Sequence, residues 1–138
     1  MTPRAASYVA GAAVLGVVAA LAACGTLCAD PCSSAVTIRL ETPDAATLST
    51  YSGSVQADER LVPFVCPNDP TADTRYSCIT NGLLLYGTPE RVHVHVDATS
   101  AGVVGELEAS PTYTVKEAQG RLCESCSQAE VTVELHGA

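Results

Sequence analysis

The sequence predicts an all-β protein, an antiparallel β-sandwich of seven or eight short strands held by disulfides. Apolar and polar residues alternate with a period of two in several short segments, which is the pattern of half-buried strands. Clusters of Pro, Asn, Asp and Gly separate these segments, and no segment sustains the 3.6-residue period of a helix. Short strands with turn signals between them are typical of sandwiches.

The alternation is clearest in two segments. Val36, Ile38 and Leu40 alternate with polar residues near the start of the expected domain. A stripe of Val92, Val94 and Val96 does the same further along. The expected strands are 35–41, 48–57, 61–66, 76–80, 83–86, 91–97, one or two within 103–115, and 131–135.

Three features refine these strands. Pro63 lies inside 61–66 and predicts an edge strand or a bulge, because proline cannot donate to a ladder. Asn81-Gly82 between two apolar runs predicts a hairpin, because a type I′ turn needs positive φ twice. Residues 116–130 are expected to form a polar loop.

The N-terminus has the three regions of an export signal. Residues 1–7 carry one positive charge, Arg4, and residues 8–20 are apolar or small without a break. A membrane-spanning helix needs about 20 apolar residues. The run 8–23 is shorter and rich in Ala and Gly, so a cleaved signal peptide is favoured over a permanent transmembrane helix.

The end of this run, Leu21-Ala22-Ala23-Cys24, resembles the lipobox of bacterial lipoproteins. The resemblance implies that Cys24 becomes the first residue of the mature protein and carries lipid on its sulfur. The alternative is an ordinary secreted protein cut near Ala22 or Ala23. The expected organisation is a signal peptide over 1–23, a lipidated N-terminus and short tether over 24–33, and the sandwich over 34–138.

The acidic composition limits the partners. The chain carries 15 Asp and Glu against 7 Lys and Arg. Phosphate binding needs a cationic surface, so nucleic acid is not an expected partner.

We expect a membrane partner through the lipid, and a protein or an envelope polymer as ligand, at an extracytoplasmic place in the bacterial cell envelope.

The number of cysteines is the second strong indication of an exported domain. Six cysteines beyond Cys24 form an even set, which in a small exported domain predicts disulfides. The sequence does not choose among the connectivities. A local Cys66–Cys78 bond is preferred, with the N-terminal pair linked across to the C-terminal pair. The alternatives are a four-thiolate zinc site formed by these two pairs and redox chemistry at the C-x-x-C of Cys123 and Cys126. The expected disulfide cysteines are Cys28, Cys32, Cys66, Cys78, Cys123 and Cys126.

The mature chain has a short Val/Thr/Ile strand, a Gly/Tyr-rich middle, paired cysteines and a terminal Val-Thr-Val-Glu-Leu at 131–135. In these features it resembles the carboxypeptidase-regulatory or transthyretin-like sandwiches of bacterial lipoproteins. It implies an accessory module without catalysis.

One cluster suggests metal chemistry. Alternation places His93, His95 and Asp97 on one face of a strand, and neighbouring residues on that face lie about 6.6 Å apart. His93 and His95 are therefore candidates to share a metal ion, although a solvent-facing row is the simpler interpretation. Glu106 and Glu108 also share a strand face, and are interpreted as exposed acids.

The sequence holds no hydrolase or phosphate-loop motif. We therefore expect no catalytic residues, no enzyme activity and no cofactor. The expected function is that of a lipid-anchored structural or binding module, and the alternative is a metal-binding envelope protein that uses His93 and His95.

Overall fold

The computed structural model describes residues 32–68, 73–117 and 125–138. By its contacts the chain divides into two units, one of residues 33–116 and 126–138, the other of residues 1–32 and 117–125. Of the second unit only three residues are described, so the description concerns the first. The segment predicted to be a signal peptide, residues 1–23, lies outside the described residues, as do Cys24, Cys28 and Cys123.

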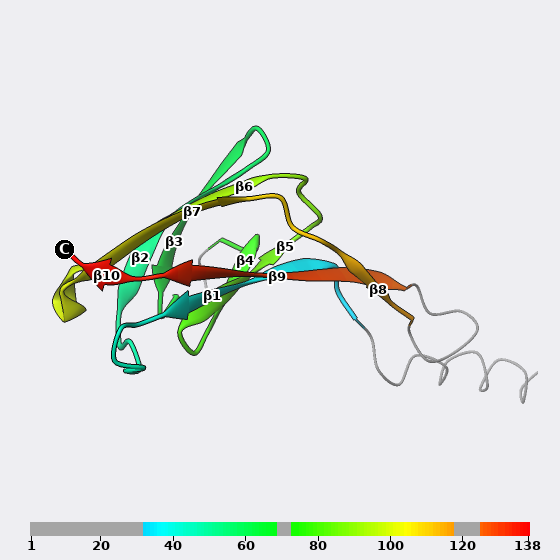
Figure 1. Cartoon of the computed structure of the whole chain (residues 1–138). Coiled ribbons are helices and arrows are strands. Elements are labelled where there is room, and N and C mark those ends of the chain that lie inside the picture. Colours follow the sequence, from blue (N-terminus) through cyan, green and yellow to red (C-terminus); the bar gives the residue numbers. More distant parts are fainter. Residues whose placement is uncertain (1–31, 69–72, 118–124) are drawn as a thin grey trace, which may run out of the picture. The chain divides into compact units, whose positions relative to one another are not determined.

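The first unit is a two-layer β-sandwich (Figure 1). Sheet A has the strand order β4-β5-β1-β9-β8, and sheet B has the order β10-β7-β6-β2-β3. A short 3₁₀ turn, η1 (Thr99–Ala101), follows β6. The strands are β1 (Ala35–Glu41), β2 (Tyr51–Ala57), β3 (Arg60–Cys66), β4 (Tyr76–Ile79), β5 (Gly82–Tyr86), β6 (Val92–Ala98), β7 (Val103–Ala109), β8 (Thr114–Lys116), β9 (Cys126–Glu134) and β10 (His136–Gly137).

The predicted all-β sandwich is confirmed, but two details of the prediction were wrong. The described residues form ten strands rather than seven or eight: β8 is a second strand at the end of the region where one or two were expected, the two-residue β10 was not expected, and β9 begins inside the expected polar loop. Sheet A is also mixed: β1 and β9 run parallel, with Ala35 opposite Gln128 and Glu41 opposite Glu134. The other pairings are antiparallel.

The core consists of the inward residues of the alternating strands. Val92, Val94 and Val96 of β6 are fully buried, as are Val36 and Ile38 of β1. These are the residues that the period-two pattern placed inside. The lone phenylalanine, Phe64, is also buried and meets the Tyr76 ring edge to face.

The predicted β4–β5 hairpin is present, but its turn is shifted by one residue. Ile79 pairs with Gly82, so the connecting residues are Thr80 and Asn81 rather than Asn81 and Gly82. Asn81 has φ 48° and fastens a neighbouring loop, since its side chain accepts from the Leu48 amide at 2.8 Å and donates to the Ala46 carbonyl. Gly82 lies in the strand, where a Cβ would approach the Ile38 carbonyl oxygen to 2.3 Å.

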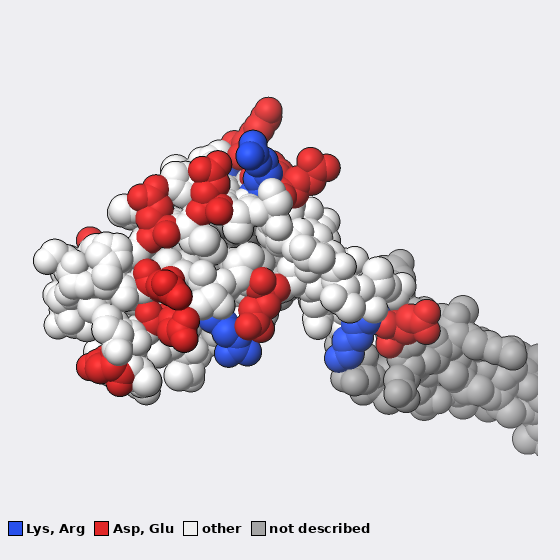
Figure 2. Space-filling view, in the orientation of Figure 1, with Lys and Arg blue, Asp and Glu red and all other residues white. Residues whose placement is uncertain are grey.

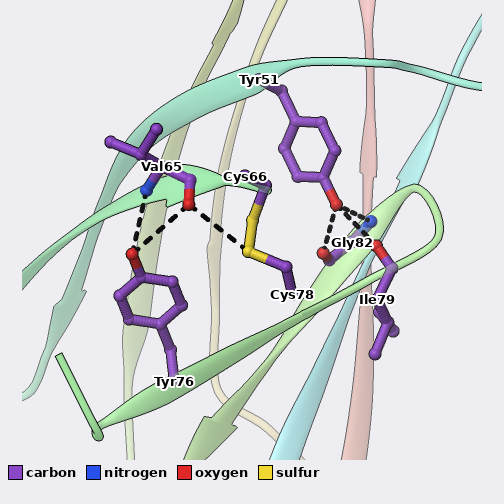
Figure 3. The surroundings of a disulfide bond; sticks show 7 residues. All are labelled: Tyr51, Val65, Cys66, Tyr76, Cys78, Ile79 and Gly82. Atoms are coloured by element: carbon purple, nitrogen blue, oxygen red, sulfur yellow. Dashed lines mark hydrogen bonds between the residues drawn. A yellow bond between two sulfur atoms is a disulfide. The ribbon is translucent and has the colours of Figure 1, made fainter. Parts of the chain in front are cut away.

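The facing edges of the two sheets are joined by the predicted Cys66–Cys78 disulfide, which is confirmed (Figure 3). Beside it, the Tyr76 hydroxyl accepts from the Val65 amide at 3.1 Å. Deeper in the sandwich, the Tyr51 hydroxyl accepts from the Gly82 amide at 3.0 Å, and burial raises the pKa of this phenol. We call the disulfide with Tyr76 and Val65 the seam.

Pro63 lies on an edge strand, as predicted, because β3 ends sheet B. The Val65 amide points away from β2 toward Tyr76, and residues two apart in a strand direct their backbone groups to the same side. The missing N–H of Pro63 therefore belongs to the outward edge, where no ladder bond is lost.

We predict that replacing both Cys66 and Cys78 by alanine lowers the free energy of unfolding by about 3 kcal/mol, because the bond closes a short loop in the unfolded chain. The two cysteines are 12 residues apart. Urea unfolding of the oxidised protein measures the change. Ser77→Ala on the same strand, which removes only an exposed hydrogen bond to Tyr86, is the control. An unchanged midpoint in the double variant would contradict the prediction.

Candidate functional site

The histidine cluster lies on the outer face of sheet B. The burial of β6 alternates as predicted, so that Val92, Val94 and Val96 face inward while His93 and His95 are exposed. Register places Ser54 of β2 and Glu106 of β7 on either side of His95. The expected common face of His93 and His95 is thus present.

Two side chains of this cluster make close contacts with neighbouring groups. His93 Nε2 contacts Glu106 Oε1, and the side chains of His93 and Glu106 are 46% and 58% exposed. Asp97 turns to the backbone, where its carboxylate accepts from the Thr99 amide at 3.0 Å. The acids therefore bind neighbouring groups on an exposed face.

No group of three or more His, Cys, Asp or Glu side chains in the described part of the chain is placed to hold a metal ion. Zinc in proteins takes at least three protein ligands and keeps tetrahedral geometry. Two imidazoles on an exposed strand fall short of this requirement. The metal site at His93 and His95 remains a hypothesis.

We expect protein purified without a His tag to carry well under one equivalent of zinc or copper, because no third ligand for the two imidazoles lies among the described residues. Elemental analysis of the purified protein measures this. Stoichiometric metal that disappears in a His93→Ala/His95→Ala variant would contradict the expectation and favour the metal site.

A second region has more of the geometry of a binding site. Between the ends of the two sheets lies an open hollow of about 600 Å³. Sheet B contributes the β2–β3 turn and the start of β3, and sheet A contributes the end of β5 and the residues around it. Buried Val62 and Leu85 belong to its lining. We call this region the end hollow; it is lined by Ala57, Asp58, Glu59, Arg60, Val62, Arg75, Leu85, Tyr86, Gly87, Thr88 and Pro89.

The β5–β6 loop, residues 87–91, forms one wall and is tied to several elements. The Gly87 amide donates to the Ser34 carbonyl at 2.9 Å. The Pro89 carbonyl accepts from the Tyr113 hydroxyl at 2.6 Å. Gly87 has φ 112°, a conformation that side-chain-bearing residues rarely adopt. The wall is therefore held from both ends of the loop.

Asp58 ties the same loop to the opposite sheet. Its Oδ1 accepts from the amides of Glu90 and Arg91, both at 3.0 Å. Its own amide donates to the Arg91 carbonyl at 3.0 Å. Burial raises the pKa of the Tyr113 phenol, and the negative charge of Asp58 raises it further. Asp58 is thus a structural residue of the wall.

Two guanidinium groups line the end hollow. Arg75 is fixed by Asp73: its Nε donates to Asp73 Oδ2 at 2.7 Å, Nη2 contacts the same oxygen, and its amide donates to Oδ1 at 2.9 Å. These bonds hold the pKa of Asp73 down at about 2. Arg60, by contrast, is exposed and makes no ion pair or side-chain hydrogen bond within the described residues.

The charge at the end hollow differs from most of the surface. The described residues carry twelve Asp or Glu side chains and five Arg or Lys side chains. In Figure 2 acidic side chains are spread over the visible face and basic ones are few. Two of those five cations line the end hollow together with two of the twelve acids, Asp58 and Glu59, so cations make up a larger share of the charged groups there than among the described residues as a whole.

The sequence analysis did not anticipate the end hollow. Arg60 follows a turn and Arg75 follows a loop, and neither position has a motif around it. Asp73 two residues before Arg75 is a weak indication of a local ion pair. The two arginines line one hollow because β3, which begins at Arg60, and β4, which Arg75 directly precedes, belong to different sheets whose ends border it.

The other predicted site residues are placed as follows. Cys32 and Cys126 are each in a disulfide, as predicted.

No helix among the described residues is long and apolar enough to cross a membrane. No family model matches the chain, and neither the curated proteins nor the solved structures include a significant match.

We predict that the carboxyl group of Asp73 titrates near pH 2, because the Arg75 guanidinium stabilises its ionised form. The folded-state pKa is depressed, so the stabilisation is complete above the ordinary aspartate pKa of about 3.9 and is lost as the pH falls through about 2. Carboxyl carbon shifts in an NMR titration measure the midpoint. Arg75→Gln should raise it and Arg39→Gln should not; a midpoint near 3.9 in the unsubstituted protein would contradict the assignment.

Proposed function

We propose that this chain is a lipid-anchored, extracytoplasmic module of the bacterial cell envelope, with a binding or structural role and no catalysis. The observation that carries the proposal is the Cys66–Cys78 disulfide between the two sheets. Cys32 and Cys126 are also oxidised. Structural disulfides form and persist in oxidising compartments and are rare in the cytosol, which supports an exported protein.

The anchor is proposed from the sequence. Leu21-Ala22-Ala23-Cys24 ends an apolar run and resembles a lipobox. A thiol is the side chain that can form the thioether to a diacylglycerol. One acyl chain binds a bilayer only marginally, whereas two or three give a stable anchor, since each buried CH₂ contributes about 0.8 kcal/mol.

The proposed absence of catalysis rests on the geometry of the described residues. His93, which contacts Glu106, is 46% exposed on an open sheet face. General acid–base groups act best where water is excluded and the pKa is tuned. The described two-layer fold is also compatible with the proposed likeness to carboxypeptidase-regulatory or transthyretin-like modules, although fold alone does not fix function.

The alternative proposal, metal binding by His93 and His95, has less support. The two imidazoles share a face of β6. In the described residues they lack a third ligand, and Glu106 already pairs with His93.

The anchor is tested in the native host. We expect mass spectrometry of the mature N-terminus to find a diacylglyceryl-modified Cys24, and globomycin or Cys24→Ala to leave an unprocessed or unlipidated form. The reason is that the modified thiol is the substrate of the lipoprotein peptidase. Thr26→Ala, which changes a neighbour outside the lipobox, is the matched control and should be processed normally. A bare thiol at position 24, with unchanged membrane association in Cys24→Ala, would refute the anchor.

A further inference from the structure

We propose that the end hollow binds a small organic anion, a carboxylate or phosphate ester carried on an apolar body. The site would give the proposed binding role a ligand class, and it rests on that role. Its volume of about 600 Å³ falls in the range of about 300–1,000 Å³ that small-molecule sites occupy.

Arg75 is the first anion-binding group. Asp73 engages its Nε and Nη2, so the guanidinium is held in one orientation and its Nη1 retains two N–H donors for a ligand. An arginine fixed in this way loses little rotamer entropy when it binds, and the planar group matches a carboxylate or phosphate. Asp73 itself does not line the hollow.

Arg60 is the second anion-binding group. It lies at the start of β3, across from β5, and makes no ion pair with the described residues. Acidic side chains are common on the surface of this protein. Among the described residues the Arg60 guanidinium pairs with none of them and borders the hollow instead. Two guanidinium groups on one hollow supply the charge-assisted hydrogen bonds that an oxyanion needs.

The apolar residues of the lining define the rest of the ligand. Val62 and Leu85 are each 2% exposed and lie between the sheet ends, with Tyr86 and Pro89 beside them. Tyr86, which is 42% exposed, supplies the accessible apolar surface that the apolar body of the ligand would contact, with its anionic group near the arginines. This combination of apolar lining and a few polar groups is usual for small-molecule sites.

The lining also holds two acids, Asp58 and Glu59, and neither makes an ion pair with an arginine among the described residues. Asp58 directs its carboxylate to the amides of Glu90 and Arg91, so its hydrogen-bonding capacity is used by the wall. Glu59 is exposed in the β2–β3 turn. The bonds from Asp58, Ser34 and Tyr113 to the β5–β6 loop also hold the wall in place before any ligand arrives, which lowers the entropic cost of binding.

The test is an NMR titration of the isotopically labelled full-length protein in a neutral detergent. The probes are benzoate, phenyl phosphate and uncharged benzyl alcohol. We expect saturable shifts at the amides of Val62, Leu85 and Gly87 with at least one anion, at an affinity of about 1 mM or tighter. The alcohol should bind more weakly than that anion, and the better anion identifies the preferred oxyanion.

Substitutions assign the binding to the arginines. Arg60→Gln should weaken anion binding about tenfold, which is the loss of one charge-assisted interaction, and Arg75→Gln should do the same. Arg39→Gln is the matched control: it removes the same charge from a surface pair with Glu130 on sheet A. Dispersed spectra of each variant confirm that it folds.

Three results would overturn the proposal: no saturable shift at these amides up to about 10 mM probe, equal binding of the alcohol and both anions, or an equal loss of affinity in Arg39→Gln and Arg60→Gln. The assay does not read the lipid. A bare Cys24 thiol together with intact anion binding would contradict the proposed anchor but not this site. An unchanged affinity for the anion in Arg60→Gln and Arg75→Gln would contradict the site but not the anchor.

Discussion

The covalent bond between Cys66 and Cys78 is the constraint on which this sandwich most depends. The chain has no Trp and one Phe, so its core is built mostly from small aliphatic side chains, and a small domain with such a core gains stability from crosslinks. The bond joins the facing edges of the two sheets, with Tyr76 bound to Val65 beside it. On the other side, the run from β9 to β10 passes from sheet A to sheet B.

The same seam limits what the sheet edges can do. An exposed edge strand invites pairing with another chain. On β3 the outward amide of Val65 is taken by Tyr76, and Pro63 has no amide to offer. Strand addition at this edge is therefore disfavoured.

The period-two pattern predicted most strands and the inward valines, because alternation follows directly from strand geometry. It did not predict the parallel pairing of β1 with β9, since a half-buried strand alternates in the same way whichever direction its neighbour runs. The Asn-Gly turn signal placed the β4–β5 turn one residue late. The Asn81-Gly82 pair satisfies a turn rule locally, whereas the fold uses Gly82 for close approach to Ile38 and Asn81 to hold the Leu48 loop.

The two candidate sites differ in how far the sequence alone predicted them. His93 and His95 are neighbours in one strand, so the sequence showed them together, but one strand supplies two ligands on an exposed face. Arg60 and Arg75 are separated by a strand and a loop, and they share a hollow because two sheets end there. A recognition site assembled from loops of different strands needs the topology first, and in this protein the topology brings one fixed and one exposed arginine to the same open hollow.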